Sequence, residues 1–129
     1  MLKTGILNPQ ILSLVSRVRH TNTLVIADRG FPFWPQIETV DIALVDDLPR
    51  VLDVLRALRG NFTVGHAWMA EEFHGVNRAK ICREFEAALE GIATTFEPHV
   101  EFKKRVPCAI GLIRTGDTTQ YGNMILESA

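Results

Sequence analysis

Short apolar runs alternate along this chain with stretches whose apolar residues recur at helical spacing. The run from Leu24 to Ala27 has no polar face, which is typical of a strand covered on both sides in a parallel sheet. Further strands are predicted at 39–45, 62–69, 94–96, 109–113 and 122–126, and helices at 9–20, 49–60, 78–91 and 98–106. Strands that alternate with helices predict an α/β protein, a three-layer α/β/α sandwich around a largely parallel sheet.

The ends of these elements carry their own signals. Asn8 is the expected N-cap of the first helix, which should end near His20, and Asn77 is the expected cap of the third helix. Residues 29–35 are too rich in proline for a regular element, so a loop is predicted after the first strand. Ligand groups in open α/β sheets lie in loops beyond the carboxyl ends of the strands, and Asp28 occupies such a position.

The composition favours one globular domain over residues 1–129. Of the 129 residues, 47% are hydrophobic, which is enough for a core. The 14 Lys and Arg balance 15 Asp and Glu for a net charge of −1, so nothing supports binding to nucleic acid or to an anionic membrane. Cys82 and Cys108 lie far apart and fit a reducing compartment. With no signal-peptide pattern at the start of the chain, we expect the cytoplasm.

The common cofactor and nucleophile motifs are missing from the sequence. It contains no GxxxxGK[ST] or GxGxxG phosphate loop, no HExxH metal motif and no GxSxG nucleophile elbow. The four histidines do not share a ligand-like local spacing, so no metal is expected. What remains is a set of acid–base groups: His20, Asp28, His99 and Tyr121.

Each of these groups also has a purely structural interpretation. A histidine at a helix C-terminus is stabilised by the helix dipole, and an aspartate after a strand often serves only a turn. His99 follows a proline and could be an ordinary first-turn residue. The pair Glu71-Glu72 is expected to be solvated, and Phe33 and Trp34 could either stack on a sugar ring or only pack.

Seven short segments, none of them diagnostic alone, follow one another in a specific order. They are Gly5-x-Leu7-Asn8 with Ile11, His20-Thr21-x-Thr23-Leu24-Val25 with Asp28, Asp41-x-Ala43-Leu44, Ala70-Glu71-Glu72, His99 with Phe102-Lys103, Ile113-Arg114-Thr115-Gly116-Asp117, and Tyr121-Gly122-Asn123-x-Ile125-Leu126. In this ordered series the chain resembles the D-ribose pyranase and L-fucose mutarotase (RbsD/FucU) family along nearly its whole length.

The resemblance implies a cofactor-free enzyme that interconverts cyclic forms of a free monosaccharide. His20 is then the acid–base residue, and the sugar site is lined by Asp28, His99, Tyr121, Gly122 and Asn123. It also implies assembly into rings, commonly decamers, with sites between subunits. The chain ends at Ala129, a little short of the usual family tail, so contacts of that tail are not carried over.

The residue types suit this chemistry. Opening a hemiacetal ring needs one proton delivered to the ring oxygen and another removed from the anomeric hydroxyl, and closing it reverses both transfers. A histidine that titrates near neutrality can do both. Asp28 can accept hydrogen bonds from sugar hydroxyls, Asn123 can donate and accept, and Tyr121 adds a hydroxyl.

The spacing of His20 and Asp28 adds an inference independent of the family. They flank an extended strand, so their separation is roughly 20–26 Å, which one small sugar cannot bridge. Either the chain folds back around Thr21-Asn22, or the site pairs His20 of one subunit with Asp28 of another. We favour the second arrangement.

Three questions stay open at this level. Ala70-Glu71-Glu72 and His99 favour the ribose branch, whereas Tyr121-Gly122-Asn123 and Phe31-Pro32 favour the fucose branch. A non-catalytic sugar-binding accessory protein of a transport system is a second function class. A phospho-acceptor receiver domain has a similar length, but it should show an acidic pair after the first strand, where this chain has Asp28-Arg29.

Overall fold

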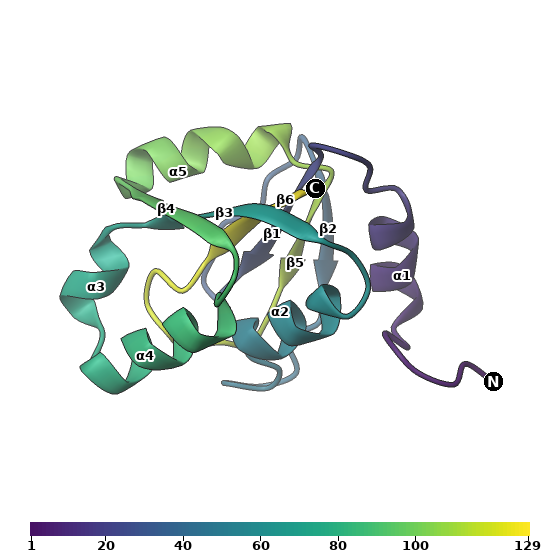
Figure 1. Ribbon diagram of the computed structural model, residues 1–129, viewed down its shortest axis with the longest axis horizontal. Helices are drawn as coiled ribbons and strands as arrows, with labels where there is room; N and C mark the ends of the chain where they lie inside the picture. The colour runs from purple at the N-terminus through teal and green to yellow at the C-terminus, as the bar shows by residue number, and fades with distance from the viewer.

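Six strands form one sheet in the order β2-β5-β1-β6-β3-β4 in the computed structural model, which describes residues 1–129 (Figure 1). The strands are β1 (Thr23–Ala27), β2 (Glu38–Asp41), β3 (Val64–Ala70), β4 (Ala93–Glu97), β5 (Gly111–Arg114) and β6 (Met124–Ser128). Every neighbouring pair is parallel except the two made by β6, which runs antiparallel to both β1 and β3. The predicted α/β fold with a largely parallel sheet is confirmed.

Helices cover both faces of this sheet. The larger core cluster joins the strands to α1 (Pro9–Ser16), α2 (Val51–Arg59), α3 (Glu72–Val76) and α4 (Ala79–Ala88). The smaller cluster joins the opposite face to α5 (His99–Arg105) and the 3-10 turn η1 (Val106–Cys108). Figure 1 shows α5 on one side of the sheet and α2 and α4 on the other. No helix combines the length and apolar composition needed to cross a bilayer.

The strand β1 lies at the centre of this arrangement. Residues 24–27 are each 0% exposed. Leu24 and Ile26 pack into the larger cluster, whereas Val25 and Ala27 pack into the smaller one, because successive side chains of a strand point to opposite faces. The continuous apolar run therefore reflects burial on both faces, as predicted.

The first helix is shorter than predicted. Asn8 caps it as expected, and its side chain accepts the Ile11 N–H at 3.0 Å, but the helix ends at Ser16. A turn follows, closed where the Asn22 side chain accepts the Arg19 N–H at 2.8 Å. His20 therefore lies at an exposed turn and not at a helix C-terminus, so the helix dipole does not account for it.

Two further predictions of element boundaries were wrong because side chains bond to the local backbone. The strand expected at 39–45 stops at Asp41, whose carboxylate accepts the Ala43 N–H at 3.0 Å. Asn77 does not cap α4, whose N-cap is Arg78; its amide instead donates to the Phe73 and Gln120 carbonyls at 2.9 Å each. The short helix α3 was not predicted.

Candidate active site

The antiparallel pairing of β1 with β6 brings Asp28 and Asn123 together. Asp28 follows the last residue of β1, and Asn123 directly precedes β6. The Asn123 side chain, 4% exposed, accepts the Asp28 N–H at 2.6 Å. The half-buried Asp28 carboxylate accepts the Gly30 N–H at 3.0 Å, so its orientation is fixed by its own loop.

The loop after β5 supports Asp28 from the other side. The Thr115 hydroxyl donates to the Ala27 carbonyl at 2.8 Å, and the Arg29 N–H donates to the Asp117 carbonyl at 3.0 Å. Between them, Gly116 is required by packing, because a Cβ at this position would collide with the Val45 carbonyl. The carboxyl ends of β1 and β5 are therefore joined by hydrogen bonds at the position where the sequence predicted a site.

His99 and Tyr121 complete the polar cluster. Their rings lie at 5.0 Å between centroids and at 88° to one another. Both carboxylate oxygens of Glu72 accept the His99 N–H, at 3.0 and 3.1 Å, and this contact joins α3 to the first residue of α5. The His99 Nε2 atom is buried without a hydrogen-bond partner. It is therefore free to donate to or accept from a ligand hydroxyl.

Two backbone positions near the predicted site residues are strained. Tyr121 has φ 55° and Thr21, next to His20, has φ 66°. Left-handed backbone is costly for side chains with a Cβ, and most of all for a β-branched residue such as Thr21. Such strain persists where the surrounding structure enforces it, and it concentrates at functional sites.

Burial shifts the pKa values of Asp28 and His99 in opposite directions. Desolvation raises the pKa of Asp28 against the hydrogen bonds with Gly30 and Asn123, which lower it, and the negative charge of Asp117 adds a smaller increase. Desolvation lowers the pKa of His99, and the nearby Lys103 acts in the same direction, against Glu72 and Asp28. The lowered pKa favours the neutral imidazole of His99 at neutral pH. In this form one ring nitrogen donates a hydrogen bond and the other accepts one, so His99 can bind a sugar hydroxyl in either sense.

The lowered pKa of His99 predicts a measurable pH dependence of stability. At a pH above 6.5, the ordinary pKa of histidine, His99 is neutral in both the folded and the unfolded chain and does not lower the free energy of unfolding. As the pH falls through 6.5 toward the lower folded pKa, the unfolded chain binds the proton first, so the free energy of unfolding decreases. In His99→Gln this contribution should vanish, while the other histidines remain as an internal control. Urea unfolding of both proteins between pH 5 and 8 measures it; parallel stability curves would contradict the assignment.

His20 lies at the opposite edge of the sheet. The Thr21 N–H donates to the Ser128 carbonyl at 2.9 Å, so the turn that carries His20 lies beside the end of β6, whereas Asp28 lies beside its beginning. The chain does not fold back around Thr21-Asn22. A single subunit thus brings together Asp28, His99, Tyr121 and Asn123, but not His20.

Exposed apolar side chains flank the polar cluster. Leu44, Val45 and Leu48 are 75%, 61% and 53% exposed, in a loop that contacts Gly116 and is linked to Arg29 by the Arg29–Asp46 ion pair at 2.7 Å. On the neighbouring loop Phe33 is 68% exposed, while Trp34 packs against the smaller core cluster. We call these four exposed residues, 33, 44, 45 and 48, the apolar rim.

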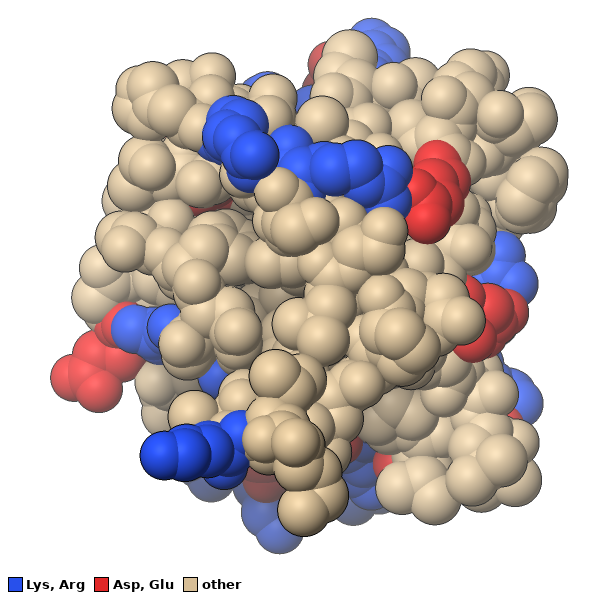
Figure 2. Space-filling view, turned by 90° about the vertical axis from the view of Figure 1, so that its right-hand side faces the viewer, with Lys and Arg blue, Asp and Glu red and all other residues tan.

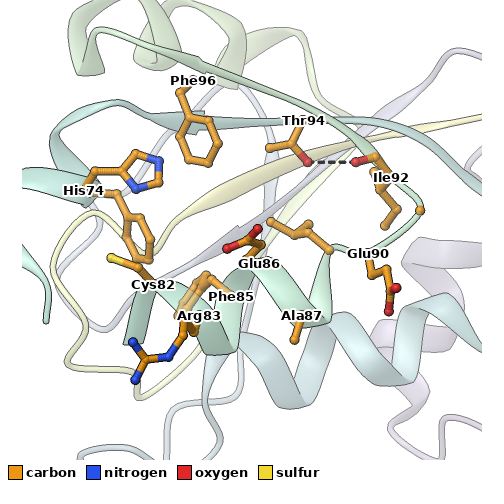
Figure 3. Close-up of a pocket in the computed structure, with 13 residues that line it drawn as sticks. His74, Cys82, Arg83, Phe85, Glu86, Ala87, Glu90, Ile92, Thr94 and Phe96 are labelled. Atoms are coloured by element: carbon orange, nitrogen blue, oxygen red, sulfur yellow. Dashed lines mark hydrogen bonds between the residues drawn. The ribbon is translucent and has the colours of Figure 1, made fainter. Parts of the chain in front are cut away.

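A separate cavity of about 920 Å³ lies between α3, α4 and β4 (Figure 3). The rings of Phe73, Phe85 and Phe96 dominate its lining, and His74 lies against Phe96 at 4.4 Å between centroids. None of the residues predicted for a sugar site lines it. Its lining mixes aromatic rings with charged and polar groups such as Arg83 and Glu86, but it holds none of the acid–base residues singled out by the sequence, so the polar cluster at Asp28 is the better candidate site.

Comparison with known proteins decides the family. The profile of the RbsD / FucU transport protein family matches residues 1–129. The chain belongs to this family. D-ribose pyranases of Bacillus cereus and Geobacillus kaustophilus are each 36% identical to it over 128 residues, which cover 99% of this chain and 97% and 93% of the relatives.

Solved structures of the family share the fold. RbsD of Bacillus subtilis, solved in complex with D-ribose, superposes with a TM-score of 0.91 at 29% identity, covering 100% of this chain and 98% of that one. The fucose mutarotase of Streptococcus pneumoniae, solved with L-fucose, superposes with a TM-score of 0.84 over 99% of this chain and 98% of that one. At 19% identity the second likeness shows the fold alone.

Two residues of this site were not assigned a role from the sequence. Glu72 was expected to be solvated, but it is half-buried and binds the backbone of His99. Asp117 lies within a family segment, yet nothing in the local pattern indicated that its carboxylate is buried. Both act through backbone N–H groups of distant segments, which no local sequence signal reports.

Proposed function

We propose that this protein is an isomerase that interconverts cyclic forms of a free monosaccharide, by acid–base ring opening and closure without a cofactor. The observation that carries this proposal is the cluster of Asp28, His99, Tyr121 and Asn123 at one edge of the sheet. It occurs in a chain that is 36% identical, over nearly its full length, to proteins named D-ribose pyranase. We assign the whole of residues 1–129 to this single sugar mutarotase/pyranase domain.

The reaction needs two proton transfers. The imidazolium of His20 delivers a proton to the ring oxygen as the bond from that oxygen to the anomeric carbon breaks, and the anomeric hydroxyl gives its proton to a water molecule as the carbonyl forms. Reclosure on either face, or through another hydroxyl, reverses both transfers. An imidazole suits this task because both of its protonation states are accessible near neutrality. The sugar hydroxyls are held by Asp28, by His99 and by the loop 121–123, which includes the backbone at Gly122.

We place the complete site between subunits, with His20 of one subunit beside Asp28 of another. Within one chain, His20 and Asp28 lie at opposite ends of the strand β1. The apolar rim beside Asp28 is a surface that a second subunit would cover. On the side of the molecule that carries α1, basic and acidic side chains form separate groups in a largely uncharged surface (Figure 2). Contacts between two unlike surfaces form a ring when the rotation between neighbouring subunits closes, and we propose such a ring assembly, a decamer by family resemblance.

D-ribose is the first substrate to test. Ala70-Glu71-Glu72 and His99 favour the ribose branch, and Glu72 binds the backbone of His99. L-fucose is the second candidate, since Tyr121-Gly122-Asn123 favours that branch. Both sugars are uncharged polyols, which suits the neutral donors and acceptors of the cluster. We place the reaction in the cytoplasm, in keeping with two cysteines that are both free.

Exchange NMR with free sugars tests the proposal. The protein is added to equilibrated D-ribose, L-fucose and D-galactose, and exchange between the anomeric signals is measured for each sugar. Faster exchange with at least one sugar is expected, in the absence of any nucleotide or metal. Saturation transfer to bound sugar without faster exchange would instead identify a non-catalytic sugar-binding accessory protein.

A further inference from the structure

We propose that Asp117 is a positioning residue that holds the loops of Asp28 and Tyr121–Asn123 together and keeps a negative charge beside Asp28. This inference rests on the proposed function, since it concerns the same site. Asp117 has no part in the mechanism above, because its carboxylate and its backbone carbonyl both bind backbone N–H groups of the protein.

The contacts of Asp117 reach three segments that are far apart in sequence. Its carboxylate accepts the Val51 N–H at the first turn of α2 at 2.9 Å and the Thr119 N–H at 2.8 Å. Its backbone carbonyl accepts the Arg29 N–H at 3.0 Å, and its own N–H donates to the Thr115 hydroxyl at 3.1 Å. The loop after β1, the loop that leads to Tyr121, and α2 are therefore joined at one residue.

The burial of this carboxylate calls for an explanation. Asp117 is only 2% exposed, and both oxygens bind backbone N–H groups rather than Lys or Arg. Each oxygen of the carboxylate accepts one N–H, whereas a neutral asparagine has a single acceptor oxygen and would point its NH₂ group at the other donor. The two loops and α2 are therefore held together by a carboxylate in particular, and its negative charge is buried beside the site.

The charged groups around Asp28 define what that charge does. Asp117 faces Asp28 from the loop after β5, His99 faces it from α5, and Arg29 follows it in its own loop but is paired with Asp46. Asp117 opposes ionisation of Asp28 in the same direction as burial, which is the largest effect, whereas the hydrogen bonds with Gly30 and Asn123 favour the ionised form. Loss of the Asp117 charge should lower the pKa of Asp28, so that Asp28 stays ionised to lower pH.

The variant Asp117→Asn separates this role from ordinary helix capping. Asparagine keeps the size of the side chain and one acceptor oxygen, but it removes the charge and points an NH₂ group at one backbone donor. The matched control is Asp53→Asn, since the Asp53 carboxylate also accepts an N–H at the start of α2, that of Arg50 at 2.8 Å, but lies on the exposed surface. A residue that merely caps α2 predicts the same outcome for both variants.

Carbon-detected NMR of the aspartate carboxyls measures the pKa of Asp28 in the free protein, where no catalysis is needed. We expect the titration midpoint of the Asp28 carboxyl to move to lower pH in Asp117→Asn and to stay unchanged in Asp53→Asn. The kcat/KM of sugar exchange should fall roughly 10–100-fold in Asp117→Asn only, through misplaced site loops. An unchanged midpoint together with an unchanged kcat/KM would overturn the inference.

Thr115→Val covers the case in which Asp117→Asn fails to fold. Valine matches the shape of threonine but leaves the Asp117 N–H without its acceptor, so kcat/KM should fall while the charge beside Asp28 remains. The midpoint of Asp28 should then move less than in Asp117→Asn. If Thr115→Val retains full activity, the positioning role is excluded. A wild-type protein that accelerates no sugar's exchange would refute the proposed function instead, and the NMR midpoints would still test the charge effect.

Discussion

Replacing His20 by alanine should lower the rate of sugar ring exchange by roughly 10²–10⁴-fold, the usual contribution of one positioned acid–base group. The affinity for sugar should change much less, because Asp28, His99, Tyr121 and Asn123 supply the binding contacts in the proposed site. The expected signature is therefore a loss in kcat with little change in KM. Exchange NMR gives the rate, and saturation transfer gives the binding.

The substitution should leave the fold intact, because His20 is an exposed turn residue whose side chain has no hydrogen bond in the structure. His74→Ala is the control for loss of an exposed histidine, since His74 is also exposed but lines the separate cavity, against Phe96. Wild-type activity in His20→Ala would refute the assignment of His20 as the acid–base residue.

Mixing two inactive variants should restore activity. If each site takes His20 from one subunit and Asp28 from another, a co-assembled equal mixture of His20→Ala and Asp28→Asn contains intact sites. Random pairing leaves about a quarter of the sites with both native residues, so about a quarter of wild-type activity is expected. The variants are co-expressed with different tags and purified through both tags before assay.

The control for this mixture is His20→Ala co-assembled with a chain that carries both substitutions. That assembly contains no site with both native residues, and it should remain inactive. Equal activity of the two mixtures would contradict a site shared between subunits. Mass measurement of the doubly tagged assembly gives the number of subunits in the ring.

The central strand shows how far local pattern can predict structure here. Residues 24–27 were predicted as a doubly covered strand, and the structure buries them completely. The helix after Pro49 and the helix that begins at His99 were also predicted, since each has an apolar stripe or a capping signal within its own sequence. Where a side chain bonded to the local backbone instead, as at Asp41 and Asn77, the predicted boundary was wrong.

The candidate site was predictable only in part. Asp28 was placed beyond a strand end by general rules of α/β sheets, and His99 and Tyr121 were among the acid–base groups left after the common motifs were excluded. The family resemblance then assigned these residues to a sugar site and added Gly122 and Asn123. Neither source indicated that Glu72 binds the backbone of His99 or that Asp117 joins three segments. Those contacts depend on chain segments that are brought together only by folding.

The sequence by itself determined the α/β class, the buried central strand and the residue types available for acid–base chemistry, because hydrophobic period and side-chain chemistry are local properties. The tertiary structure alone decided that β6 runs antiparallel between β1 and β3. That single reversal places Asn123 beside Asp28 and Ser128 beside the turn of His20. Strand order follows from the packing of all the layers together, so no local stretch of sequence encodes it.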